Sequence, residues 1–326
     1  MNAISAIRSG LGRAFGQSRL ILILWAINVV VALPLAVVLG ASIHDSTGHS
    51  LVAQSLETGF DTGWHSELED AARGIESTFD PSVVGVGAFL DNLEAWWTGR
   101  LLRGGASGFP GLVAVGVIFA LLWAFLLGGI LQRFARPEGF EGQVFSQVFF
   151  GNCGRFFFRF VRLAFFSGLV YLAIYALGRA YFHALQDWTR DVTSERTVLV
   201  WVLVGAAGVV ALLMLVRLLF DLTKVMVMLE DRHGVLLTLG SAVQVFAGRP
   251  LPFVVLYAAV ALLWLLALVL YALVAPTAGP AGWLGVILAF LLGQVLLAVR
   301  IGLRLSLLCG DMAVYRDSLR VSDAGS

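Results

Sequence analysis

Charge and cysteine are both scarce in this sequence. Only 13% of its 326 residues are charged and 59% are hydrophobic, whereas soluble domains carry about 25% charged residues. Because water could solvate so little of such a surface, this balance excludes a soluble globular protein. The two cysteines, Cys153 and Cys309, both fall on the predicted cytoplasmic side, so no structural disulfide is expected.

Motifs for catalysis, metal binding and nucleic-acid binding are also missing. The sequence has no His-Glu-x-x-His helix and no Gly-x-Ser-x-Gly elbow, and its 5 histidines lack ligand spacing. An aspartyl pair of Asp221 and Asp311 is disfavoured, because Asp311 follows the last apolar run and cations flank Asp221. A net charge of +1 argues against a nucleic-acid partner. We therefore predict neither an enzyme nor a bound cofactor or metal.

Long apolar runs dominate what is present. Each of six runs is long enough to cross a bilayer, which takes about 20 residues of helix. The predicted fold is therefore all-α, a polytopic membrane bundle of six transmembrane helices. The runs cover residues 20–43, 110–132, 155–186, 197–229, 250–275 and 282–309.

Three segments beside these runs have the composition of helices lying on a membrane surface. Residues 1–19 carry three arginines and no acid, with apolar residues at helical spacing, which predicts an amphipathic interfacial helix. Segments 137–154 and 235–249 are predicted to lie in the same interface. Residues 310–326 are interpreted as a short polar tail.

The segment 44–109 is the one long polar stretch. It holds 10 acidic residues against 3 arginines, and we expect one helix around 64–79 and a second starting after the Asp80-Pro81 pair. We interpret it as an acidic periplasmic loop that caps the membrane. A lid that captures a ligand is the alternative.

The distribution of lysine and arginine predicts the orientation. If the first run crosses from inside to outside and the runs alternate, 16 of the 22 Lys and Arg residues fall on the inner side. Basic residues concentrate on the cytoplasmic side of membrane proteins. We therefore predict a multi-pass membrane protein with both termini in the cytoplasm.

Similar short sequences precede three of the runs. Each has an aromatic residue, then Gly, then Arg, as in Phe246-Ala247-Gly248-Arg249, and the stretches before the third and fifth runs share Gln-Val-Phe. A glycine frees the backbone to turn, and an arginine anchors the turn at phosphate depth. We predict three repeated units of surface helix plus transmembrane hairpin, over residues 1–132, 137–229 and 235–308.

The sequence resembles poorly characterised bacterial six-span inner-membrane proteins in two features. One is the set of Gly-Arg hairpins, and the other is the stretch that begins Asp221-Leu222-Thr223-Lys224 and continues to Arg232. The sequence is also loosely similar to the membrane domains that accompany glycerophosphodiester phosphodiesterases. The resemblance covers the spans and leaves out the acidic loop. It implies an architecture and no catalytic residue.

A group of charges near the inner ends of two runs is the candidate site. Three lie four and then three residues apart, so they share one helix face and the aspartate can pair with either neighbour. Charges at this depth usually face the bundle interior. Three interpretations stay open: an interhelical ion-pair clamp, a pocket for an anionic lipid headgroup, or a transport path for an anion. The candidate residues are Arg217, Asp221, Lys224, Arg300 and Arg304.

The sequence favours a non-enzymatic membrane component that acts in lipid or envelope handling. Its expected partners are membrane lipids, including anionic headgroups, and further protein chains or copies of itself. The alternative is a small transporter or permease-like subunit that uses the cationic cluster for an anionic substrate. A transporter predicts a broken helix, and no run is clearly interrupted.

Overall fold

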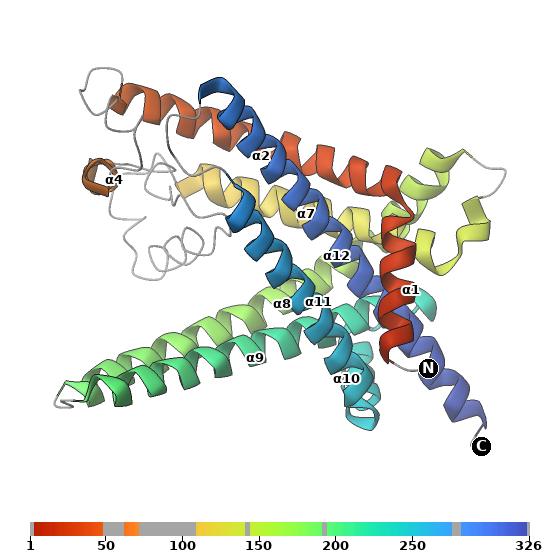
Figure 1. The fold of residues 1–326 in the computed structure, drawn as a ribbon. Helices are drawn as coiled ribbons and strands as arrows, with labels where there is room; N and C mark the ends of the chain where they lie inside the picture. The colour runs from red at the N-terminus through yellow and green to blue at the C-terminus, as the bar shows by residue number, and fades with distance from the viewer. Residues whose placement is uncertain are drawn as a thin grey trace. The chain divides into compact units, whose positions relative to one another are not determined.

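The computed structural model describes residues 3–47, 62–71, 109–140, 144–190, 194–275 and 282–324. Within these ranges, six helices are long and apolar enough to cross a membrane, which confirms the predicted all-α, multi-pass class. They are α2 (Ser18–Thr47), α7 (Phe109–Ala135), α8 (Phe145–Thr189), α9 (Glu195–Leu229), α11 (Pro250–Val274) and α12 (Gly282–Ala324) (Figure 1). The shorter helices are α1 (Ala3–Phe15), α4 (Thr62–Ala71), η2 (Pro137–Phe140) and α10 (Val235–Gly248).

Apolar side chains cover the outside of these helices. In α9, every residue from Leu199 to Val204 is at least 37% exposed. Contiguous apolar surface of this kind is rare on soluble monomers, because water solvates it poorly. Lipid chains solvate it well, so the exposed residues agree with a polytopic membrane protein.

The chain divides into two compact units. The first contains Met1–Gln17, Leu121–Leu265 and Gly302–Ser326, and the second contains Ser18–Ala120 and Leu266–Ile301. In the second unit the indole nitrogen of Trp25 donates to Gln294 at 2.9 Å. Gln294 therefore joins α2 and α12 by a hydrogen bond.

Glycines allow close helix contacts in the first unit. A Cβ added to Gly128 of α7 would lie 2.6 Å from the backbone oxygen of Asn152 in α8, and one added to Gly10 of α1 would lie 2.7 Å from that of Ser306 in α12. Small residues let helix backbones approach in this way. Helices α8 and α9 also run side by side as a long hairpin, and α10 lies against α9 (Figure 1).

The predicted turn at Gly154-Arg155 is wrong. Helix α8 passes through it without a break, so the predicted interfacial segment before residue 155 and the third span form one helix from Phe145. Glycine permits a turn without forcing one, and the buried Phe149 and Cys153 hold this stretch against α7.

The corresponding break before the fifth span does occur. Arg249 separates α10 from α11 and has φ −149° and ψ 71°. The residue after it is Pro250, whose ring disfavours a helical conformation in the preceding residue. Another break, at Gly16 and Gln17, separates α1 from α2.

The predicted polar tail is also wrong for most of its length, because α12 continues to Ala324. Apolar residues recur past Gly310 at helical spacing, and Leu308, Met312 and Tyr315 are buried. The acidic loop lies mostly outside the described residues. Its described helix, α4, covers part of the helix expected around 64–79, and the second expected helix lies outside the described ranges.

Candidate functional site

Three of the predicted site residues form an ion-paired row on α9. Lys224 Nζ lies 2.6 Å from Asp221 Oδ1, and Arg217 Nε lies 3.7 Å from Asp221 Oδ2. The Asp221 carboxylate is buried, whereas the Arg217 side chain is half exposed. Because all three residues belong to one helix, their ion pairs compensate a buried charge within α9 and do not clamp two helices together.

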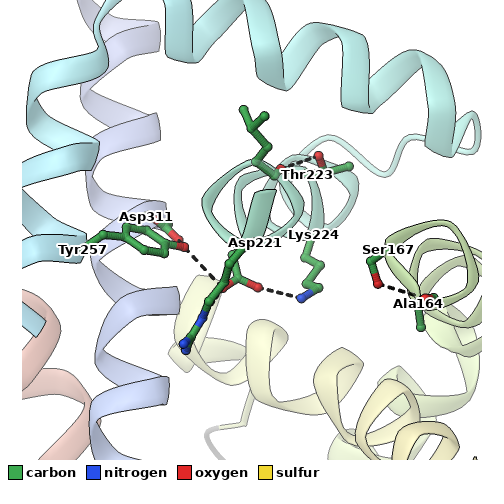
Figure 2. Close-up of polar contacts among 9 residues, drawn as sticks. Ala164, Ser167, Asp221, Thr223, Lys224, Tyr257 and Asp311 are labelled. Carbon is green, nitrogen blue, oxygen red and sulfur yellow. Dashed lines mark hydrogen bonds and ion pairs between the residues drawn. The ribbon is translucent and has the colours of Figure 1, made fainter. Parts of the chain in front are cut away.

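The contact between helices is made by a tyrosine and a second aspartate. The Tyr257 hydroxyl on α11 lies 3.2 Å from Asp221 Oδ2 and 2.9 Å from Asp311 Oδ2 on α12. Figure 2 shows Tyr257 pointing toward Asp221, with Asp311 beside Tyr257 and Lys224 on the far side of Asp221. We name Lys224, Asp221, Tyr257 and Asp311 the buried polar chain, and all four residues belong to the first unit.

Asp311 is the most enclosed member of the buried polar chain. It is 0% exposed, and its Oδ1 atom has no hydrogen-bond partner among the residues that the structure describes. No described Lys or Arg forms an ion pair with it. A carboxyl group in this setting is costly as an anion, because it is fully buried and no described cation contacts it.

The two remaining predicted site residues lie on α12. The guanidinium of Arg304 stacks on the ring of Trp123 in α7, 3.7 Å from its centroid, which is a cation–π contact. Arg304 also lies close enough to Asp221 to act on it electrostatically. Arg300 belongs to the second unit, whereas the other four predicted site residues belong to the first.

A second polar group lies where α9 ends and α10 begins. Asp231 has a positive φ of 52°, and its carboxylate receives Arg155 and Arg159 of α8 at 2.5 Å each. The hydrogen bond from Arg159, together with both positive charges, holds the pKa of Asp231 below its usual value. Beside it, Glu230 accepts hydrogen bonds from Arg232 and from Tyr315 of α12.

Arginines gather where α1, α7 and α12 meet. Arg316 lies near Arg13, Arg136 and Arg320, and the four charges repel one another. Arg316 donates to the carbonyl oxygen of Ala135 at 2.8 Å. We name Arg13, Arg136, Arg316 and Arg320 the arginine patch, and the structure shows no ion pair between these four and a described acidic residue.

No protein-family model, curated protein or solved structure matches this chain. The site is therefore defined by its own geometry.

Sequence reasoning missed Tyr257 and Asp231. It considered Asp311 beside Asp221 and disfavoured it because Asp311 follows the last apolar run, whereas α12 continues through Asp311 and Tyr257 contacts both aspartates. Tyr257 lies in a continuous apolar run, where a tyrosine reads as a core residue. Asp311 follows that kind of run, yet the apolar spacing continues past it, and this continuation was the available signal that the helix extends. Asp231 was one of several charged residues in the polar link between the fourth run and the segment 235–249, and nothing in its spacing indicated a role.

Proposed function

We propose that this protein is a non-enzymatic component of a bacterial inner membrane that binds anionic lipid headgroups at the arginine patch. The proposal includes cytoplasmic N- and C-termini, since the patch then faces the leaflet side where basic residues concentrate. Three distant parts of the chain contribute its arginines: α1, α12 and the residue that follows α7. The observation that carries the proposal is this convergence of four positive charges without a described acidic partner.

The chemistry of arginine supports a phosphate-bearing ligand. A guanidinium donates two parallel hydrogen bonds to phosphate oxygens, which gives both strength and geometry. Each Lys or Arg near an anionic leaflet contributes about 1 kcal/mol of binding free energy. An anionic headgroup would also relieve the repulsion among the four arginines, so binding and local stability should rise together.

The cluster predicted from sequence supports this role less well. Lys224 and Arg217 already contact the Asp221 carboxylate, and Arg304 is engaged by Trp123. A small transporter for an anionic substrate is the second candidate. The buried polar chain favours it, because ionisable residues inside membrane proteins commonly mark ion pathways.

The test is native mass spectrometry of the full chain with phosphatidylglycerol or phosphatidylcholine. The variant Arg13→Gln/Arg320→Gln removes two exposed members of the arginine patch, and the matched control Arg190→Gln/Arg196→Gln removes two arginines elsewhere. We expect wild type to prefer phosphatidylglycerol and the patch variant to lose about fivefold in affinity per arginine. Equal binding of both lipids, or the same loss in the control, would contradict the proposal.

A further inference from the structure

The buried polar chain contains one hydroxyl proton for two hydrogen bonds. The Tyr257 oxygen lies within hydrogen-bonding distance of a carboxyl oxygen on each side, 3.2 Å to Asp221 and 2.9 Å to Asp311. A tyrosine hydroxyl donates one hydrogen bond, and an ionised carboxylate donates none. If both aspartates were ionised, one short contact would bring two oxygen lone pairs together. An additional proton on one carboxyl group removes this conflict.

The surroundings of the two carboxyl groups differ, and this difference decides which of them holds the additional proton. Asp221 has Lys224 at 2.6 Å and Arg217 at 3.7 Å, so its negative charge is compensated. Asp311 is fully buried, has no cation in contact among the described residues, and leaves Oδ1 without a partner. The neutral acid is the form that such a site accommodates.

We infer that Asp221, Tyr257 and Asp311 form a proton-binding relay, in which one proton beyond the tyrosine's own resides on Asp311 at neutral pH. In this state Asp311 donates from Oδ2 to the Tyr257 oxygen, and Tyr257 donates to Asp221 Oδ2. Transfer moves the Asp311 proton to the Tyr257 oxygen while the Tyr257 proton moves to Asp221. The product is an Asp311 carboxylate, a neutral tyrosine and a neutral Asp221, so protons and charge balance.

Charged and titratable groups from several helices face this relay. The cations act mainly at the Asp221 end, and none is within hydrogen-bonding distance of Asp311. Because Asp221 and Asp311 both contact the Tyr257 hydroxyl, we treat them as one coupled pair of acids. The facing groups are Arg217 and Lys224 of α9, Arg304 and Cys309 of α12, and Tyr171 of α8.

The relay makes a helix contact depend on a proton. With the proton present, hydrogen bonds join α9, α11 and α12 in sequence (Figure 2). Without it, two anions face one hydroxyl group, and one of the two contacts must open. Carboxyl groups that exchange protons inside a helical bundle are the usual elements of proton-coupled membrane proteins. This inference is independent of lipid binding at the arginine patch.

Infrared spectroscopy of the full chain in nanodiscs tests the relay, because a protonated carboxyl group has a carbonyl band separate from that of a carboxylate. At neutral pH we expect one such band in wild type, its loss in Asp311→Asn, and its persistence at a shifted frequency in Tyr257→Phe. Asp221→Asn and the exposed control Asp187→Asn should retain the band. Its loss in Asp221→Asn with retention in Asp311→Asn would overturn the assignment, as would the absence of the band in wild type.

Three further measurements keep the test decisive if Asp311→Asn fails to fold. Asp311→Glu should shift the band without removing it, and alkaline titration of wild type should remove it in one step. Replacing potassium chloride with sodium chloride should leave it unchanged. Loss of the band in sodium would mean that a metal cation occupies the carboxyl pair, and this result would overturn the proton assignment.

Discussion

At the scale of single residues, two buried aspartates of the same membrane protein have different environments. Asp221 is compensated by cations on its own helix, whereas Asp311 contacts a tyrosine hydroxyl and apolar neighbours. The consequences of mutating them should therefore differ. Replacing the Asp221 carboxylate leaves its cations without a counter-charge. An amide in place of the neutral Asp311 carboxyl group has nearly the same shape and polarity.

Asp221→Asn should destabilise the protein by about 3 kcal/mol, because Lys224 then remains in a largely buried position without its partner. The measurement is the thermal unfolding midpoint of purified protein in detergent. Asp221→Asn/Lys224→Met should recover part of this loss, since the double variant no longer buries a lysine without its carboxylate and leaves only the half-exposed Arg217 without it. Additive losses in the double variant would contradict a coupled pair.

Tyr257→Phe should cost about 1–3 kcal/mol, because it leaves two buried carboxyl groups without the hydroxyl between them. The same unfolding measurement applies. The matched control is Tyr271→Phe, because Tyr271 lies on the same helix but belongs to the second unit. Equal effects of the two variants would indicate that the bridge contributes nothing specific.

At the scale of helices and their junctions, small residues and a single aspartate determine how neighbouring helices meet. Gly128 brings α7 against the backbone of α8, and Asp231 ties the end of α9 to the arginines of α8. Both contacts lie in the first unit. Neither depends on the long apolar faces that dominate the sequence.

Gly128→Ala should destabilise the protein by about 1–3 kcal/mol, because its Cβ would meet backbone atoms of α8 and force the two helices apart. Gly116→Ala in the same helix is the control, since a Cβ there meets nothing within 4 Å. The control should be neutral or slightly stabilising through higher helix propensity. Thermal unfolding of both variants measures the difference.

Asp231→Asn should remove part of the acid sensitivity of the protein. The pKa of Asp231 is lowered in the folded state, so its stabilising effect is present above the unfolded value of about 3.9 and is lost as the pH falls through the folded value. Asparagine also tolerates the positive φ. We expect the variant to be less stable at pH 7 and to approach wild type below pH 4, as measured by unfolding across pH. A constant difference across this range would contradict the linkage.

At the scale of the whole molecule, the class of fold could be predicted from the sequence because each span must be apolar to be solvated by lipid. Six apolar runs of sufficient length required six helices, whatever their neighbours. The helix ends were less predictable: Pro250 broke its helix for a local covalent reason, whereas Gly154 did not, because packing on α7 decided the outcome. Spacing along α9 was enough to predict the ion pairs of Asp221 with Arg217 and Lys224. The contact of Asp221 with Tyr257 depends on packing between distant segments, which spacing along one helix cannot reveal.

The predicted orientation can be tested with single cysteines. The native Cys153 and Cys309 are buried and should give little background labelling. A membrane-impermeant maleimide should label Asp45→Cys in intact cells and Leu319→Cys only after the inner membrane is permeabilised, because basic residues concentrate on the cytoplasmic side. The reverse pattern would invert the orientation and remove the arginine patch from the cytoplasmic leaflet.

Helix α8 is longer than the hydrocarbon layer of a bilayer is thick. At about 1.5 Å per residue, its 45 residues extend about 68 Å, more than twice the hydrocarbon thickness of about 30 Å. From Arg162 to Trp188 the rise is about 39 Å, close to the span between opposite headgroup layers. The turns before Arg162 thus have no hydrocarbon left to cross. Because Asp231 receives Arg155 and Arg159 from those turns, we expect it to lie in the aqueous headgroup zone, where changes in pH and salt can reach it.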